Sequence, residues 1–383
     1  MRTVTWLPPV VICAAAKNDV VQPRIDVKMT DNANIAALKP CLVSLKAGRP
    51  YAWCSCGHSS KQPFCDGSHQ GTGFEPLRYV PEKDEEVLLC ACKHTRSAPF
   101  CDGSHNDLSE TYAEAAPEDF ADALNVDYQS VAGQAFETAS LDNGCYVLRG
   151  KGSTLLDEDT TFIGELISGA TGARHLAQYY VLVQSGTTPV LSFPGAEVVI
   201  YLAQGEASVS ISSREFAMPV ETGAYVRAGE AFSLSNHDDS PLQAIITVCP
   251  GEADLVVLDE MPGNFDADCA RRTRSYNIEE RDHMADRHLM ELVNHELGCE
   301  QVTQFIGEVP KSRAAFHHHL YEEAIYIISG SGTLWNQETK ADVVPGDIIF
   351  LPERQAHSLE CTDNGGMRLM GVFYPAGSPK VNY

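Results

Sequence analysis

Residues 313–330 read RAAFHHHLYEEAIYIISG, a run of imidazoles and carboxylates that leads into an apolar stretch ending at a glycine. Because side chains alternate along a strand, His317 and His319 are expected on one face and His318 on the other. Glu323 follows after a short gap, and His357 lies just beyond the apolar segment GDIIFLP. Three imidazoles and one carboxylate suit Fe(II), Mn(II) or another divalent ion.

On their own, three adjacent histidines are more typical of a solvated surface run than of a metal site. The spacing of the other residues favours a metal site, because it resembles the two motifs of the cupin superfamily, a small β-barrel that binds a divalent metal inside its mouth. The residues that carry this resemblance are His317, His319, Glu323, Gly330, Gly346, Pro352 and His357. The resemblance implies that His317, His319, Glu323 and His357 hold one metal ion, Fe(II) preferred and Mn(II) second, and form the catalytic site.

Two positions depart from the cupin motifs. Lys311 stands where the first motif has its leading glycine, and Arg354 stands where the second motif has a glycine. These departures affect turns and leave the four ligands in place. Glu322 is a lesser candidate ligand, because strand parity and spacing both favour Glu323.

The sequence from about Thr161 onward predicts a β fold in two related copies. Short apolar runs are separated there by Gly, Pro, Asn and Asp, as in a β-sandwich or barrel. Residues 199–205, VIYLAQG, parallel residues 324–330, AIYIISG. Two tandem cupin barrels are the most economical interpretation.

The first copy of this repeat lacks the metal ligands. The residues aligned with the four ligands of the second copy are Ser192, Pro194, Val198 and Phe232. We therefore expect the first barrel to bind no metal and to pack against the second. Glu197 and His237 leave an alternative metal site in the first barrel.

A second repeat lies nearer the N-terminus. Residues 54–69 read CSCGHSSKQPFCDGSH, and residues 90–105 read CACKHTRSAPFCDGSH. Each copy offers two cysteines one residue apart, a third cysteine after a loop closed by proline, and a histidine four residues later. A first helical turn after the third cysteine would bring the histidine to its side. These ligand types suit tetrahedral zinc as well as an iron–sulfur cluster.

The paired motifs resemble the CDGSH iron–sulfur family, also called the NEET family, in its tandem-motif form. The resemblance implies two [2Fe–2S] clusters rather than zinc. The implied ligands are Cys54, Cys56, Cys65 and His69 for the first cluster and Cys90, Cys92, Cys101 and His105 for the second. An imidazole in place of one thiolate raises the reduction potential, and its protonation makes the potential depend on pH.

Composition narrows the classes of partner. The formal net charge is −24, from 28 basic and 52 acidic residues, so neither nucleic acid nor a membrane surface is expected to bind. No uninterrupted apolar run reaches the roughly 18 residues that span a bilayer, which predicts a soluble protein. Thirteen cysteines, an odd number, favour a reducing compartment over a disulfide scaffold.

We expect a cytoplasmic protein. Residues 1–16 combine Arg2 with a short apolar run that Pro8 and Pro9 interrupt. One alternative is a transit segment within residues 1–28, which would make the protein organellar. Another is that the true start of translation is Met29.

Together these patterns predict a mainly β chain, with a small CDGSH module followed by two tandem cupin barrels. The expected domains are 1–35, an uncertain N-terminal extension; 36–108, the CDGSH module; 109–160, an acidic linker with a short helix; 161–260, the ligand-free barrel; and 261–383, the metal-binding barrel. The short helix is expected to start near Pro117.

We expect an enzyme, an Fe(II)-dependent oxidoreductase or dioxygenase in which the two clusters relay electrons to the barrel metal. One alternative is a redox-neutral isomerase or hydrolase that uses a divalent metal and is regulated by the clusters. Another is a non-catalytic redox sensor or cluster carrier. Expected partners are a small-molecule substrate, an electron-donor protein and a second copy of the chain bound through the cupin barrels.

Overall fold

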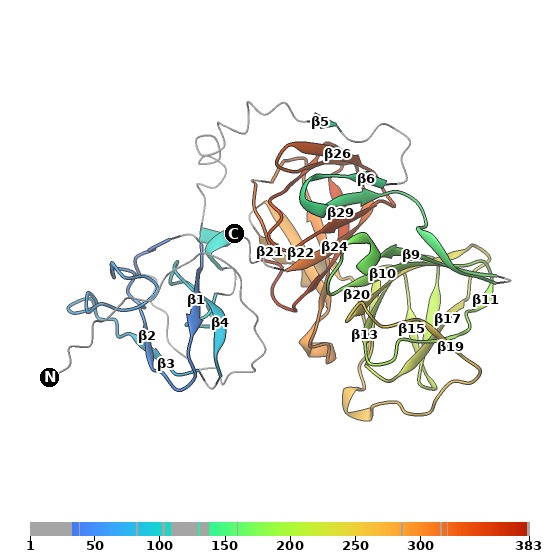
Figure 1. The fold of residues 1–383 in the computed structure, drawn as a ribbon, viewed down its shortest axis with the longest axis horizontal. Helices are drawn as coiled ribbons and strands as arrows, with labels where there is room; N and C mark the ends of the chain where they lie inside the picture. Colours follow the sequence, from blue (N-terminus) through green and yellow to red (C-terminus); the bar gives the residue numbers. More distant parts are fainter. Residues whose placement is uncertain are drawn as a thin grey trace. The chain divides into compact units, whose positions relative to one another are not determined.

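A computed structural model describes residues 33–37, 39–81, 83–101, 104–108, 129–130, 138–158, 160–284, 286–314, 316–319 and 321–380. The chain forms two compact units, Met1–Ala113 with Lys380–Tyr383, and Glu114–Pro379 (Figure 1). The helix expected near Pro117 and most of the N-terminal extension lie outside the described residues. Within the described ranges, no helix combines the length and the apolar character needed to cross a membrane.

The first unit consists of two small antiparallel sheets. Strand β1 pairs with β4, and β2 pairs with β3. The elements are β1 Cys41–Leu45, β2 Tyr51–Trp53, β3 Leu77–Tyr79, β4 Glu85–Leu89 and the 3-10 helix η1 Ser104–Leu108. Their buried side chains form one small apolar core that contains Val43, Leu45, Trp53, Val87 and Leu89. This core also contains Cys90 and Cys92 of the second motif, and its Trp53 directly precedes Cys54 of the first.

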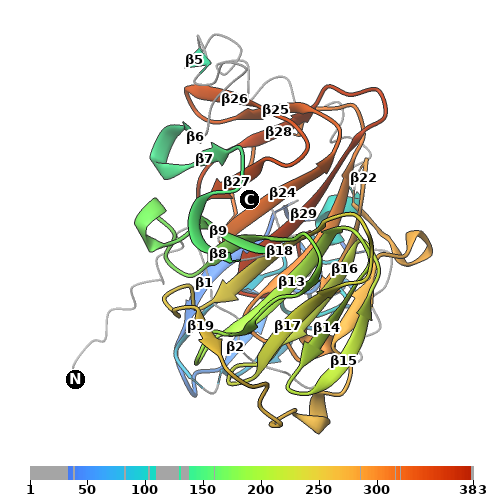
Figure 2. The same cartoon turned by 90° about the vertical axis from the view of Figure 1, so that its right-hand side faces the viewer.

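The second unit consists of two β-barrels, and its first barrel is made of two facing sheets (Figure 2). Seven strands follow the order β20-β16-β13-β18-β10-β9-β8, and six form β15-β14-β17-β12-β19 with β11 paired to β17. Their bounds are β8 Ser153–Glu158, β9 Thr161–Ile167, β10 Ala177–Val183, β11 Gly186–Thr187, β12 Val190–Ser192, β13 Glu197–Gln204, β14 Ala207–Ile211, β15 Arg214–Met218, β16 Thr222–Val226, β17 Ala231–Asn236, β18 Leu242–Cys249, β19 Val256–Leu258 and β20 Thr273–Ser275.

The second barrel has an eight-stranded sheet, β21-β22-β23-β29-β24-β27-β7-β6, and a four-stranded sheet, β28-β25-β26-β5. The bounds are β5 Gln129–Ser130, β6 Thr138–Ser140, β7 Tyr146–Leu148, β21 Asp282–Met284, β22 Arg287–Val293, β23 Thr303–Val309, β24 Glu322–Ser329, β25 Gly332–Trp335, β26 Thr339–Val343, β27 Ile348–Leu351, β28 Ser358–Cys361 and β29 Met367–Tyr374. Short 3-10 helices connect strands: η3 Asp142–Gly144, η4 Gly169–Thr171, η5 Ala267–Cys269, η6 Ile278–Glu280 and η7 His295–Leu297. The expected fold class, mainly β with tandem cupin barrels, is confirmed.

The apolar runs of the central strands follow from burial on both faces. In β13, Val198 and Ile200 point into the core of the first barrel, whereas Val199 and Tyr201 belong to an apolar layer shared by the two barrels. In β24, Ala324 contributes to the same layer from the other side. A strand that is buried on both faces has no polar face to alternate with, so its sequence is nearly continuously apolar.

The domain boundaries differ from those expected from the sequence. Residues 138–148, assigned to a linker, form β6 and β7, and β7 pairs with β27 to extend the large sheet of the second barrel. Strand β8 lies in the same expected linker but pairs with β9 of the first barrel. Strand β20 lies beyond the expected boundary at residue 260, yet it pairs with β16 of the first barrel. Strands of three residues carry too little periodicity to reveal their partners.

An ion pair between half-buried Arg149 and buried Asp347 holds the segment that contains β7 against β27. Arg149, just after β7, donates from Nε to Asp347 Oδ1 at 2.8 Å and from Nη2 to Oδ2 at 2.7 Å. The Asp347 side chain is 1% exposed. Bidentate pairs of this kind add geometric specificity, so the register of β7 against β27 is well defined.

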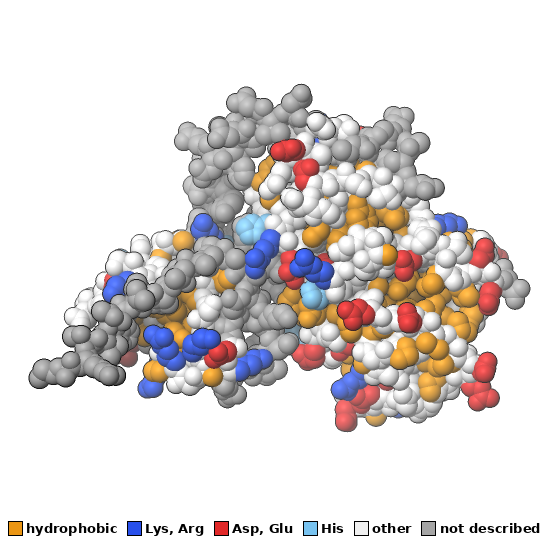
Figure 3. All heavy atoms as spheres, viewed as in Figure 1, with side chains coloured by type: hydrophobic (Ala, Val, Ile, Leu, Met, Phe, Trp, Pro, Cys, Tyr) orange, Lys and Arg blue, Asp and Glu red, His pale blue; other side chains and the backbone are white. Residues whose placement is uncertain are grey.

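The acidic excess lies in the cupin part of the chain. Residues 36–108 contain eight basic and eight acidic residues, although the whole chain carries −24. Figure 3 shows acidic side chains spread over the visible face of the barrels. Electrostatic repulsion of polyanions is therefore a property of the cupin unit rather than of the CDGSH unit.

Candidate cluster sites and candidate metal centre

Both CDGSH loops fold back onto the strand that precedes them. Cys54 N donates to Pro63 O at 2.9 Å, and Cys90 N donates to Pro99 O at the same distance. The chain then passes the strand again, because Cys65 N donates to the carbonyl oxygen of Ala52 at 2.8 Å. These backbone bonds bring the third cysteine of a motif next to the first two.

The ligand atoms of the first motif form two pairs. The Sγ atoms of Cys54 and Cys56 are 3.7 Å apart, and Cys65 Sγ lies 3.1 Å from His69 Nδ1. A cluster with two irons needs such pairs, because each iron takes two protein ligands. The arrangement of the ligands in two pairs matches the two irons of such a cluster.

The second motif repeats this arrangement. The Sγ atoms of Cys90 and Cys92 are 3.4 Å apart, and Cys101 Sγ lies 3.4 Å from His105 Nδ1 in η1. A hydrogen bond from the Cys92 thiol, together with the N–H of Lys93, lowers the pKa of Cys90 despite burial. N–H donors that favour the thiolate are what a cluster ligand needs.

The aspartate of the first motif is structural. Its carboxylate accepts hydrogen bonds from the hydroxyl and backbone N–H of both Ser60 and Ser68, at 2.7 to 3.1 Å. The bonds from Ser68, and then those from Ser60, hold the pKa of Asp66 well below its ordinary value. Asp66 therefore ties the two halves of the loop together on either side of Cys65.

Sequence reasoning missed Trp53 and Lys93. Trp53 is 1% exposed and Lys93 is 0% exposed, although Lys93 lies in a polar loop. Burial lowers the pKa of the Lys93 ammonium, and the nearby thiol groups, Cys54 foremost, oppose that shift. Direct comparison of the two motif copies contained a signal, because the position of Lys93 corresponds to Gly57 in the first copy.

In the second barrel, three imidazoles converge. The ligand nitrogens of His317, His319 and His357 all lie within 4.8 Å of one another. His317 and His357 form an isolated β-bridge, with backbone N–H to carbonyl distances of 3.1 and 2.9 Å. The two distant motifs therefore meet through main-chain hydrogen bonds as well as through their rings.

The chemistry of His357 fits a metal ligand. Its Nδ1 lies 2.8 Å from the carbonyl oxygen of Gln355, which can only accept, so Nδ1 carries the proton and the Nε2 lone pair is available. Burial, followed by repulsion from His317, lowers the pKa of His357 to about 3. The ring is therefore neutral at pH 7, as a ligand must be.

Glu323 lies beside this triad. Its Oε2 is 3.5 Å from His319 Nε2, and the residue is 3% exposed. Burial alone raises the pKa of Glu323 to about 8. A cation at the triad would reverse that shift, because an adjacent positive charge favours the carboxylate. The donor set is therefore suited to a divalent ion held by three imidazoles, with Glu323 adjacent to them.

Glu322 has a different role from its neighbour. Its carboxylate accepts three backbone N–H groups of the first barrel, from Arg174 at 2.8 Å, His175 at 3.1 Å and Leu176 at 2.9 Å. Glu322 therefore joins the two barrels on the outer face of β24. The strand parity that favours Glu323 as the inward carboxylate agrees with this arrangement.

The two departures from the cupin motifs have local explanations. Arg354 has a φ of 64°, the left-handed region in which glycine is favoured, and its N–H donates to His319 O at 2.7 Å. The arginine is thus strained by roughly 1–2 kcal/mol relative to glycine. Lys311 instead extends over the surface and donates to Asn364 Oδ1 at 2.8 Å.

Aromatic rings form one wall of the triad. Tyr321 stacks on His319 with centroids 4.4 Å apart and on Phe373 with centroids 4.2 Å apart. Tyr326, in contrast, faces Tyr201 in the apolar layer between the barrels. Tyr321 is therefore the tyrosine of this segment that touches a candidate ligand.

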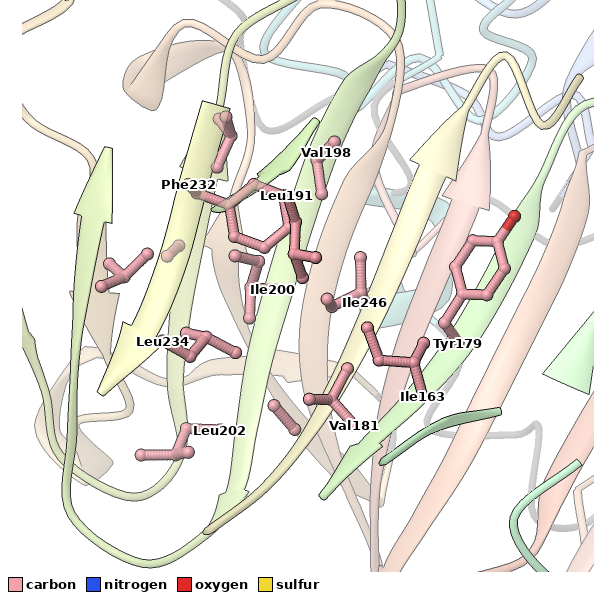
Figure 4. Close-up of a cluster of buried hydrophobic side chains, with 14 of the residues drawn as sticks. Ile163, Tyr179, Val181, Leu191, Val198, Ile200, Leu202, Phe232, Leu234 and Ile246 are labelled. Carbon is pink, nitrogen blue, oxygen red and sulfur yellow. The ribbon is translucent and has the colours of Figure 1, made fainter. Parts of the chain in front are cut away.

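The first barrel is filled with apolar side chains at the corresponding place. Figure 4 shows Val198 and Phe232 in one core with Leu191 and Ile200. The alternative pair is not brought together: Glu197 accepts a hydrogen bond from Tyr225 at 2.7 Å, whereas His237 Nε2 contacts Ser208 Oγ at 2.8 Å. Glu197 belongs to the interface between the barrels.

Fold and ligand geometry together define a CDGSH-type unit joined to a double-barrel cupin. Residues 21–70 and 75–106 match the family model described as iron-binding zinc finger CDGSH type, and residues 307–373 match the model of the cupin domain. The chain therefore carries a CDGSH iron–sulfur domain in its N-terminal part and a cupin domain in its C-terminal part. Both resemblances drawn from the sequence are confirmed.

Individual relatives match short parts of the chain. The human CDGSH iron-sulfur domain-containing protein 3, mitochondrial, is 51% identical over 61 residues, which are 15% of this chain and 48% of that protein. L-ectoine synthase of Mycobacterium sp. (strain KMS) is 32% identical over 66 residues, 17% of this chain and 50% of that protein. The chain spans about half the length of these curated relatives.

Among solved structures, a mutant of oxalate decarboxylase OxdC from Bacillus subtilis aligns with 65% of this chain and 80% of its own. The sequence identity is 12% and the TM-score is 0.48. Values this low carry no argument about activity.

Proposed function

We propose that the protein is an iron-dependent cupin oxidoreductase or dioxygenase that takes electrons from two [2Fe–2S] clusters in its CDGSH unit. The observation that carries the proposal is the triad of half-buried His317 and buried His319 and His357, whose ligand nitrogens lie within 4.8 Å of one another. A site with imidazole and carboxylate ligands and open positions suits Fe(II), with Mn(II) as the second choice.

The residues around the triad have separable tasks. The Gln355 carbonyl fixes the His357 ring so that Nε2 points away from its hydrogen bond. Tyr321 covers one face of His319, and Phe373 packs behind Tyr321 and supports it. Glu323 holds a proton on its buried carboxyl group until a cation favours its release. When bound, the metal supplies Lewis acidity and one-electron chemistry to a small-molecule substrate.

The proposal is tested by loading the full chain with Fe(II) without oxygen, reducing its clusters and then adding oxygen. We expect oxygen consumption together with reoxidation of the clusters, followed by visible absorbance. His317→Ala should abolish both and lower iron content by about one ion per chain. His318→Ala is the matched control and should preserve both. Equal reoxidation rates in the parent and in His317→Ala would rule out electron transfer to the barrel metal.

A redox-neutral metal enzyme is the second candidate, because one curated relative, which aligns over 66 residues, is named L-ectoine synthase. In that case the clusters regulate rather than donate electrons. Oxygen would then reoxidise the reduced clusters at the same rate whether or not the barrel holds its metal. Turnover of a substrate, once found, would continue with the clusters held in either redox state.

Cellular location is open to a direct test. The human relative carries the word mitochondrial in its name, and residues 1–28 are the candidate transit segment. We propose that a fluorescent fusion of the full chain is cytoplasmic. Relocation of the fluorescence to an organelle, and its loss on removal of residues 1–28, would establish the organellar alternative.

A further inference from the structure

The two CDGSH copies differ in the residue after their second cysteine. It is Gly57 in the first copy and Lys93 in the second, and both have left-handed backbone, with φ of 78° and 70°. Glycine is required at residue 57, because a Cβ there would lie 1.6 Å from the carbonyl oxygen of Asn34. A lysine in this conformation is strained, and such strain persists where the surrounding structure enforces it.

The Lys93 side chain is held by residues from both motifs. Its Nζ donates to Cys90 O at 2.9 Å and lies 4.7 Å from the centre of the Trp53 ring. Trp53 Nε1 donates to the same carbonyl oxygen at 2.8 Å. Because Trp53 directly precedes Cys54, the ammonium group sits between a ligand residue of the second motif and the strand that delivers the first.

The charge of Lys93 is balanced by sulfur ligands. Among the ion pairs of the described residues, no carboxylate is paired with Lys93. The thiol groups that act on Nζ are, in decreasing order, those of Cys54, Cys90, Cys41 and Cys92. A buried ammonium persists only when it is compensated, and the thiolates of both motifs would provide that compensation when they hold clusters.

We propose that Lys93 is a shared internal counter-cation of the two clusters and raises the reduction potential of both. The inference rests on the proposed clusters and concerns their tuning. Each cluster becomes more negative when it accepts an electron, and a fixed cation in a medium of low polarity stabilises the reduced form more than the oxidised form. Lys93 would thus act on the reduction potentials through its charge, without being a ligand of either cluster.

The test is a spectroelectrochemical titration of the cluster absorbance in the full chain, comparing Lys93→Met with Lys93→Arg. The exposed Lys61→Met in the loop of the first motif is the control for removing one charge from the unit. His105→Cys changes the ligand of the second cluster only and so identifies which transition belongs to it.

Lys93→Met should lower both midpoints enough to change the ratio of reduced to oxidised cluster at fixed potential at least tenfold, about 59 mV for a one-electron couple. Lys93→Arg and Lys61→Met should change that ratio less than threefold. Unchanged midpoints in Lys93→Met with intact absorbance overturn the proposal, and a shift of one cluster alone overturns the shared role.

Cluster assembly separates the remaining outcomes. If Lys93→Met loses its clusters while Lys93→Arg keeps them, the positive charge is required and the proposal stands. If both variants lose them, the shape of lysine rather than its charge is needed, and the proposal fails. Absence of iron–sulfur absorbance in the parent chain would instead refute the clusters themselves.

Discussion

Replacing Glu322 by alanine should destabilise the cupin unit while leaving its metal in place. The carboxylate, 2% exposed, accepts three backbone N–H groups of the first barrel at 2.8, 3.1 and 2.9 Å. Each buried donor that loses its acceptor costs about 1–3 kcal/mol, and water entering the vacated space recovers part of this. We therefore expect a loss of about 3–5 kcal/mol in the free energy of unfolding.

Two further variants calibrate that magnitude. Glu322→Gln retains one acceptor oxygen and should lose about 2 kcal/mol. Glu353→Ala removes a carboxylate from the loop that precedes His357; its contact is His175 Nε2 at 3.5 Å, and both side chains are about one-third exposed. That exposed pair should be worth less than about 1 kcal/mol.

The assay is urea unfolding of the full chain followed by circular dichroism, with iron content measured on the same samples. Glu322→Ala should lower the midpoint without changing the iron bound per chain, whereas Glu323→Ala should lower the iron content. A loss below about 1 kcal/mol for Glu322→Ala would refute the hydrogen-bond reasoning, since it would mean that the three N–H groups find other acceptors.

Three other outcomes are expected. In chelator-treated protein, Glu323 binds a proton in the folded state between its ordinary pKa of 4.5 and about 8. The unfolded state does not bind this proton there, so the free energy of unfolding should fall as pH rises through that window, by at most about 1.4 kcal/mol per pH unit. Urea titrations at several pH values measure this slope, and a slope that persists in Glu323→Gln contradicts the assignment. Gly371→Ala places a Cβ 2.4 Å from the Phe305 ring and should cost about 1–3 kcal/mol in the same assay, whereas Gly377→Ala, 4.0 Å from its nearest neighbour, should be nearly neutral. Asp66→Ala removes four hydrogen bonds of the first loop, and absorbance should decay faster for one cluster of two; equal decay would argue against the structural role.

Much of both sites was predictable because their ligands are set by local spacing. The interval between Cys65 and His69 is a single turn, and the pair formed by Cys54 and Cys56 lies just after one strand. The meeting of His317 with His357 required knowledge of the cupin topology, since a backbone bridge across 40 residues leaves no local signal. A family resemblance supplied what residue spacing alone did not.

The features that escaped prediction depend on tertiary neighbours. Strand parity predicted that Glu323 rather than Glu322 faces inward, but the role of Glu322, which accepts three N–H groups of the first barrel, depends on a loop 146 to 148 residues away in the sequence. Lys93 appears in a polar loop yet is 0% exposed. Strands as short as β6 and β7 have no periodicity from which a partner barrel could be deduced.

The pairing of β7 with β27 has a consequence for biosynthesis. Leu148 pairs with Ile348, so the emerging chain must keep the edge formed by β7 unpaired while about 200 further residues are made. At 5–20 residues per second this interval lasts roughly 10–40 s, during which the whole first barrel can fold. An open strand edge is a template for wrong pairing. During this interval, binding by a chaperone or by another nascent chain would decide whether β7 is still free to pair with β27 of the same chain.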